Sequence, residues 1–219
     1  MSNIIICGYT TEGTTDIRFL QNIIRKTFEE IAFECDGVIE VYDPIFIGFP
    51  KPGGFIDAST KIAAKAFEDG MHTICIHVDA DHHDESKVIE NKITPAVEHI
   101  STLTNVCKNI ISVIPVHMTE GWMLADKELF KDEIGTSLSD EALNINRDPE
   151  AISDPKALIK EALRIAQESL PRRRRKIVIS DLYQPLGQKL SITALEELES
   201  FRNFKESVRG AFRKLGYLQ

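Results

Sequence analysis

The sequence has few cysteines and no long apolar run. Its four cysteines, at positions 7, 35, 75 and 107, show no Cys-x-x-Cys spacing, and three lie in or beside apolar segments. We therefore expect buried, reduced thiols, which argues against a disulfide scaffold or a zinc site. No apolar stretch approaches the roughly 20 residues that cross a bilayer, and no charged and then apolar leader opens the chain. We expect a cytoplasmic protein without membrane contact.

Positive charge is also scarce over most of the chain. Lys and Arg total 26 against 34 Asp and Glu, a formal net charge of −8, which argues against a protein that coats nucleic acid by bulk attraction. Residues 171–219 differ, because they hold 11 Lys and Arg against 5 Asp and Glu and leave 15 against 29 for the rest. The densest basic run is Arg172, Arg173, Arg174 and Arg175. It is either a phosphate-backbone contact or a solvated segment that supports solubility.

Short apolar runs alternate with segments of helical periodicity over the first 120 residues. Such alternation, repeated four times, favours a mainly parallel sheet with helices on its faces. Strands are expected at 3–7, 38–47, 73–78 and 109–116, and helices at 17–31, 57–68 and 85–103.

After residue 122 the pattern becomes helical, with helices expected at 158–169 and 195–215. At 219 residues and 42% hydrophobic composition, the chain can bury a sizeable core. We expect an α/β core over residues 1–130 and a helical, net-basic extension over residues 131–219 that packs on it.

Carboxylates follow two of the expected strands. Glu12 and Asp16 come after the first strand, and Asp79 and Asp81 come after the third. Open α/β sheets build their sites where strands reach their carboxyl ends, and hard oxygen ligands suit Mg²⁺ or Mn²⁺. The two motifs converge only if strands one and three are neighbours. This pattern predicts a divalent-metal site.

Further ligands are expected among Asp84, Glu120 and Asp126. Glu120 is the first choice because it follows a strand end, and Asp16 and Asp84 are less favoured. Each acidic motif has a simpler explanation. Glu12 and Asp16 could stabilise a helix N-terminus through its dipole, and Asp79 with Asp81 could form a solvated loop.

Histidine and tryptophan near these motifs invite other interpretations. His77, His82 and His83 could bind zinc with carboxylates, but the adjacent His82 and His83 are poorly placed to share an ion. A polar-loop role is preferred for these two, with His83 an outside candidate for proton transfer. Trp122 could stack on a base, although packing is the commoner role of a single tryptophan.

Glu12-Gly13 after a first strand and Asp79-x-Asp81 after a later strand resemble the Toprim domain of topoisomerases, primases and OLD-type nucleases. The segment 118–126 and the C-terminal tail resemble a family of uncharacterised single-domain Toprim-like proteins. Members of that family are often encoded near ATPases in microbial defence regions. The resemblance covers nearly the whole chain.

The resemblance implies a Toprim-like, Rossmannoid fold and a Mg²⁺- or Mn²⁺-dependent nuclease that cleaves phosphodiester bonds of DNA or RNA, with a role in anti-phage defence. Asp79 and Asp81 would bind the metal, with Asp84 and Glu120 as further ligands. Glu12 would complete the site or act as general acid or base. A nucleic acid, an ATPase subunit and a second copy of the chain are the partners it suggests.

Two alternatives stay open. One is a non-catalytic subunit of an ATPase-containing complex, whose acidic cleft binds metal and whose basic tail docks a partner. The other is a phosphatase with an Asp-x-Asp nucleophile pair. In that haloacid-dehalogenase-like pattern the pair ends the first strand, whereas here it ends the third, so this alternative is the weaker one.

Overall fold

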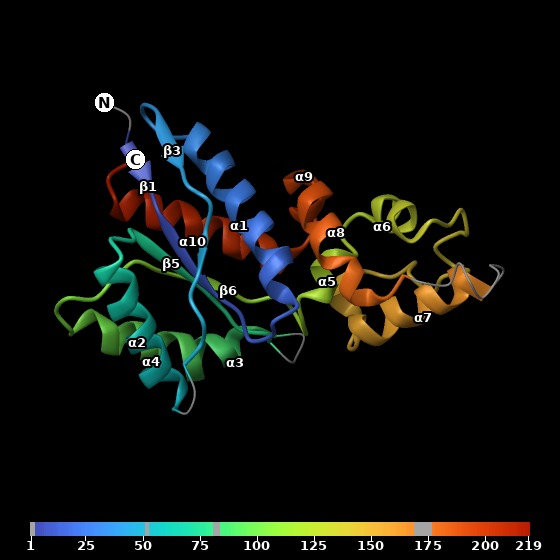
Figure 1. Cartoon of the computed structure of the whole chain (residues 1–219), viewed down its shortest axis with the longest axis horizontal. Coiled ribbons are helices and arrows are strands. Elements are labelled where there is room, and N and C mark those ends of the chain that lie inside the picture. The colour runs from blue at the N-terminus through green and yellow to red at the C-terminus, as the bar shows by residue number, and fades with distance from the viewer. Residues whose placement is uncertain (1–2, 51–52, 81–83, 169–176) are drawn as a thin grey trace.

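A computed structural model of the chain describes residues 3–50, 53–80, 84–168 and 177–219. Four parallel strands form a sheet in the order β4-β2-β5-β6, and helices cover both of its faces (Figure 1). The expected α/β class, with a mainly parallel sheet flanked by helices, is confirmed and is consistent with a Rossmann-like fold. The strands are β2 (Cys7–Thr10), β4 (Ile45–Phe46), β5 (Thr73–His77) and β6 (Ile110–Val113).

Two of the expected strands are each divided in two. β1 (Asn3–Ile5) pairs with β3 (Ile39–Val41) in a separate parallel ribbon. Between β1 and β2, the N–H of Ile6 donates to Nδ1 of the His72 ring (2.9 Å), and the His72 N–H donates to the Ile6 carbonyl (2.9 Å). This side-chain contact replaces the strand pairing at Ile6 and interrupts the first expected strand.

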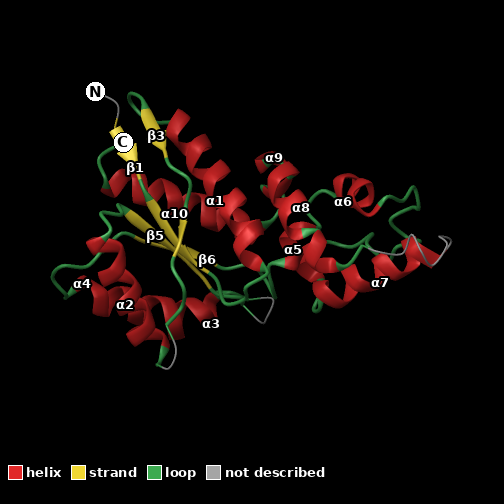
Figure 2. Ribbon diagram, viewed as in Figure 1, coloured by secondary structure: helices red, strands yellow, loops and turns green. Residues whose placement is uncertain are grey.

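The sheet is the middle of three layers (Figure 2). One face packs against α1 (Asp16–Phe33) and α10 (Glu199–Lys214), and the other packs against α2 (Phe55–Glu68) and α4 (Thr94–Ser101). A short α3 (Ser86–Val88) and a π-helical turn, η1 (Ile89–Ile93), lead into α4 just before Pro95, which lacks the N–H for a regular helical bond. Within the described residues, no helix has the length and apolar character to cross a membrane.

The helical segments after β6 share a hydrophobic core with the sheet. One cluster joins strand residues such as Tyr9 and Val113 to Phe201 and Phe212 of α10, so residues from both sides of position 130 bury the same face. Cys7, Cys75 and Cys107 are buried and all four thiols are free, as expected. The remaining elements are α5 (Glu120–Met123), α6 (Lys127–Ile134), η2 (Pro149–Ala151), α7 (Pro155–Glu168), η4 (Ile179–Asp181), α8 (Tyr183–Lys189) and α9 (Ile192–Leu195).

Helix α8 lies very close to α1. A Cβ atom at Gly187 would stand 2.9 Å from the carbonyl oxygen of Phe19, so only glycine fits there. Lys26 of α1 donates through Nζ to the carbonyl oxygens of Gly187 (3.0 Å), Gln188 (2.5 Å) and Leu190 (2.8 Å). These bonds satisfy the carbonyls that the end of α8 leaves without helical partners and hold the two helices in register.

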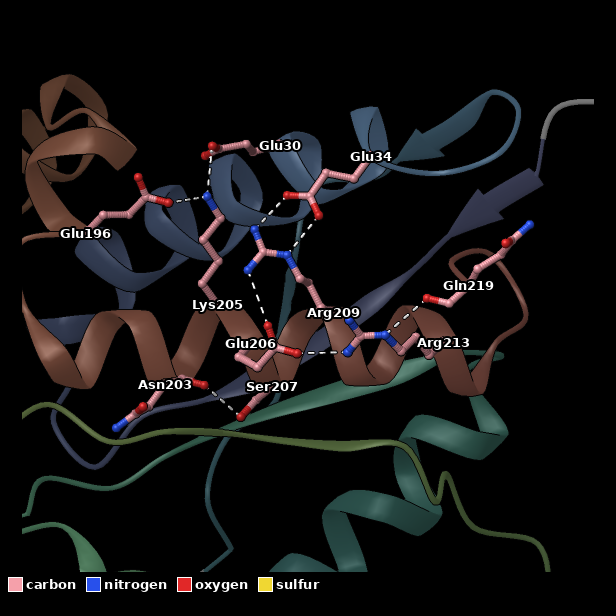
Figure 3. Close-up of polar contacts among 10 residues, drawn as sticks. All are labelled: Glu30, Glu34, Glu196, Asn203, Lys205, Glu206, Ser207, Arg209, Arg213 and Gln219. Atoms are coloured by element: carbon pink, nitrogen blue, oxygen red, sulfur yellow. Dashed lines mark hydrogen bonds and ion pairs between the residues drawn. The ribbon is translucent and has the colours of Figure 1, made fainter.

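A network of ion pairs joins α10 to α1 (Figure 3). Lys205, which is 4% exposed, bonds through Nζ to Glu30 (2.9 Å) and to Glu196. Arg209 forms a two-pronged pair with Glu34, through Nε at 2.8 Å and Nη2 at 2.7 Å, and this guanidinium lowers the pKa of the Glu34 carboxyl. The network fixes the C-terminal helix on the layer that carries the first helix.

We predict that Lys205→Met lowers the free energy of unfolding by about 1–2 kcal/mol, because hydrogen bonds between charged groups are lost while the aliphatic stem is kept. Urea unfolding measures this, with Lys214→Met on the exposed side of the same helix as the control. Unchanged stability of Lys205→Met would mean that these bonds only offset the desolvation of the ammonium.

Candidate active site at the carboxyl ends of the strands

The segments that follow β2, β5 and β6 meet at one end of the sheet. β2 and β6 both pair with β5 in parallel, so the chain leaves all three strands at the same edge. The neighbouring position of the first and third expected strands, on which convergence of the two acidic motifs depends, is thereby confirmed.

A buried histidine connects the three segments. The His77 ring, at the end of β5, is fully buried. Its Nε2 lies 3.2 Å from Oδ1 of Asp79 and 3.0 Å from Oγ1 of Thr119, and the Thr119 N–H donates to the same Asp79 oxygen at 3.1 Å. On its other side, Nδ1 accepts from the backbone N–H of Glu12 at 3.4 Å. His77 belongs to β5, within the strand expected at residues 73–78.

The bonds of His77 determine which ring nitrogen carries the proton. A backbone N–H can only donate, so Nδ1 accepts and the neutral ring carries its proton on Nε2, toward Asp79. Burial lowers the pKa of His77, but the hydrogen bond and charge of Asp79, with the charges of Asp16 and Glu12, raise it by more. The Glu12 N–H opposes protonation at Nδ1, since two donors would then face each other. The ring thus orients Asp79.

Asp16, the first residue of α1, lies among these groups with 6% exposure. Its pKa is raised to about 6, mainly by burial and also by the negative charges of Asp79 and Glu120, against the lowering effect of His77 and Lys156. A Cβ atom at Gly13 would stand 2.5 Å from the Asp16 carboxylate, so a side chain there would displace it. Asp16 is a central carboxylate of the site, although the sequence favoured Glu120 over it as a ligand.

We predict that Asp16→Asn stabilises the protein at neutral pH. A raised acid pKa means that the folded state holds more protons than the unfolded state between the ordinary aspartate pKa of 3.8 and about 6, so wild-type stability falls as pH rises through this window. Without the charge, the variant should be more stable by about 2–3 kcal/mol at pH 7 and lose that advantage near pH 4. Urea unfolding across this range, without divalent ions, measures it; a difference independent of pH would contradict it.

Glu120 lies in the segment after β6, and two side chains from the C-terminal helices bind its carboxylate. It is 2% exposed. Its Oε1 accepts a 2.5 Å hydrogen bond from the hydroxyl of Tyr183 in α8 and lies 2.9 Å from Nζ of Lys156 in α7. Burial raises the pKa of Tyr183, and the bond to Glu120 raises it further, so the phenol stays protonated and donates to the carboxylate.

The other predicted ligands occupy different places. The Glu12 carboxylate is exposed and its Oε1 is 3.9 Å from Nζ of Lys92. Asp84 is exposed, and its Oδ1 accepts from the N–H of Ser86 (2.9 Å) before α3. Asp126 caps α6 by accepting from the Leu129 N–H at 2.9 Å.

Several predictions concern residues outside the described part of the chain. These are the metal ligand Asp81, the loop histidines His82 and His83, and the phosphate contacts Arg172, Arg173, Arg174 and Arg175.

Trp122 takes the packing role. It is 1% exposed, its ring packs edge-on against Phe201 with centroids 5.3 Å apart, and its Nε1 donates to Oγ of Ser200 at 2.7 Å. A buried indole with a satisfied N–H cannot stack on a base, so the alternative of base contact is wrong.

The carboxylates of this edge suit a hard divalent cation. In the residues that the structure describes, no group of three or more His, Cys, Asp or Glu side chains is close enough to hold a metal ion. A closed zinc site needs such a group, whereas Mg²⁺ commonly takes one or two carboxylates and completes its shell with water and substrate phosphates. Asp79 and Asp16 fit the second pattern.

A hollow of about 620 Å³ lies beside the carboxylate edge, and Asp84 and Val116 from the segments after β5 and β6 line it. Its wall is acidic, with Glu85, Asp148, Glu150 and Glu199. Burial raises the pKa of Glu85, and the charges of Glu150, Glu199 and Asp84 raise it further, while a bond from Asn203 lowers it. A bare phosphate would be repelled there.

The chain matches none of the known protein families, curated proteins or solved structures with which it was compared.

Proposed function

We propose that the protein is a divalent-metal-dependent nuclease of the Toprim kind that hydrolyses phosphodiester bonds of DNA or RNA. The observation that carries this proposal is the meeting of Asp16, Asp79 and Glu120, each from the segment after a different parallel strand, at one edge of the sheet. Open α/β sheets place their ligands at this edge, and carboxylates in such an arrangement serve Mg²⁺-dependent phosphoryl chemistry.

Asp79 and Asp16 would hold the ion, and Asp81 is a third candidate from the sequence. When bound, Mg²⁺ or Mn²⁺ would lower the pKa of a water molecule and neutralise charge on the phosphate. The chain's own residues prepare the site for this. His77 and the Thr119 N–H both bond Oδ1 of Asp79, which fixes the carboxylate before any ligand arrives.

The test is a titration of Mg²⁺ and Mn²⁺ with three substrates, plasmid DNA, single-stranded DNA and structured RNA, and wild-type protein. We expect metal-dependent cleavage of at least one substrate, which also identifies its class. The same samples are melted with and without metal, because a cation that binds only the folded state raises the melting temperature.

The result also separates the nuclease from the interaction-subunit alternative. That alternative has its own support in the structure, since Lys156 and Tyr183 already partner Glu120. Stabilisation by metal without cleavage of any of the three substrates would favour a subunit that binds metal and needs a partner such as an ATPase. The absence of both cleavage and stabilisation would overturn both the nuclease proposal and the interaction-subunit alternative.

A further inference from the structure

We infer that Lys156, from the helical part of the chain, is the cation that receives the substrate phosphate at the carboxylate site. This inference rests on the proposed nuclease function. It is carried by the position of the Lys156 ammonium, by the surplus of carboxylates around it and by a second partner that keeps Glu120 in place.

Lys156 lies between the buried carboxylate of Glu120 and the solvent. Its Nζ is 2.9 Å from Oε1 of Glu120, and its side chain is 42% exposed whereas that of Glu120 is 3% exposed. The residue belongs to the first turn of α7, after Pro155. A cation near a helix N-terminus is disfavoured by the helix dipole, so this placement is not explained by the stability of α7 itself.

The charge of Lys156 interacts with all three carboxylates of the site. Its pKa is raised by the hydrogen bond to Glu120, against burial, and by the charges of Glu120, Asp16 and Asp79. The negative charges of these three carboxylates repel a phosphate diester. An ammonium is a compact donor that binds phosphate as a point charge, and Lys156 is positioned to offset that repulsion where a substrate would approach.

Glu120 does not depend on Lys156 alone. Tyr183 donates its hydroxyl to the same oxygen at 2.5 Å, and α8, which carries Tyr183, is fixed on α1 by the contact at Gly187 and the bonds of Lys26. Lys156 can therefore turn from Glu120 to a phosphate oxygen without leaving a buried carboxylate unpartnered, a loss that would be costly.

The test compares Lys156→Gln and Lys156→Arg with Lys160→Gln, an exposed lysine one turn further along α7. Binding of a labelled single-stranded oligonucleotide is measured in EDTA over a range of salt, and kcat and KM are measured in Mn²⁺. Loss of one phosphate contact should lower the slope of log K against log salt by about 0.7. Loss of a charge that stabilises the transition state should lower kcat/KM of Lys156→Gln by about 100-fold.

Lys156→Arg should restore the salt slope, because arginine keeps the positive charge, and Lys160→Gln should behave as wild type. Thermal melts of each variant verify the fold. If Lys156 only neutralises Glu120, the double variant Glu120→Gln with Lys156→Gln regains the wild-type salt slope; under this inference the slope stays reduced.

The failures are distinguishable. Wild-type cleavage together with an unchanged salt slope and kcat/KM in Lys156→Gln would overturn the role of Lys156 and leave the nuclease proposal standing. A wild-type protein that neither binds the oligonucleotide nor cleaves with metal would overturn both.

Discussion

Replacing Asp79 by asparagine is expected to lower metal-dependent cleavage by about 1,000-fold, in the range seen when a preorganised electrostatic group is removed from an active site. Asparagine keeps an oxygen at the position that accepts from the Thr119 N–H (3.1 Å), so the fold should survive. Only the negative charge available to a cation disappears. Initial rates with the cleaved substrate, at saturating Mn²⁺, measure the effect.

Asp126→Asn is the matched control. Its carboxylate caps α6, and asparagine is an equally good cap, so the same chemical change outside the site should leave cleavage near the wild-type rate. Equal activity of Asp79→Asn and wild type would remove Asp79 from the mechanism. Equal loss in both variants would point to a general effect of charge on substrate binding.

Trp122→Ala is expected to lower the free energy of unfolding by about 3–5 kcal/mol, the usual cost of truncating a large buried aromatic residue. The substitution opens a cavity between α5 and α10 and leaves the Ser200 hydroxyl, 2.7 Å from the indole Nε1, without its donor. Urea unfolding, followed by circular dichroism because the only tryptophan is removed, measures the change.

Trp122→Phe keeps most of the ring and should cost less than Trp122→Ala. A loss below about 1 kcal/mol in the alanine variant, combined with weakened oligonucleotide binding, would contradict the packing role and restore the alternative of base stacking.

The order of strands and helices was predictable because it depends on local patterns. The apolar run at residues 73–78 is long enough to be read as a buried strand, and β5 occupies residues 73–77. The break between β1 and β2 was not predictable, because it depends on the ring of His72 bonding the Ile6 N–H from 66 residues away. A side chain that replaces a strand partner leaves no local signal.

The same distinction between local and long-range signals explains which site residues were predicted and which were missed. Asp79 and Glu120 were found because a carboxylate after a strand end is visible in the sequence. Lys156 and Tyr183 come from helices after residue 150, and only the packing of α7 and α8 brings them to Glu120. A lysine in a helix has no distinguishing pattern, although its place just after Pro155, where a cation is disfavoured, was a weak signal.

The most direct test of the central claim is a calorimetric titration of Mn²⁺ into wild type and Asp79→Asn at neutral pH. The carboxylate edge is proposed to hold a divalent ion before any substrate is present. We expect saturable binding to wild type and a loss of that binding in the variant. Identical titrations for the two proteins, or no binding to wild type, would contradict a metal site at the meeting point of β2, β5 and β6.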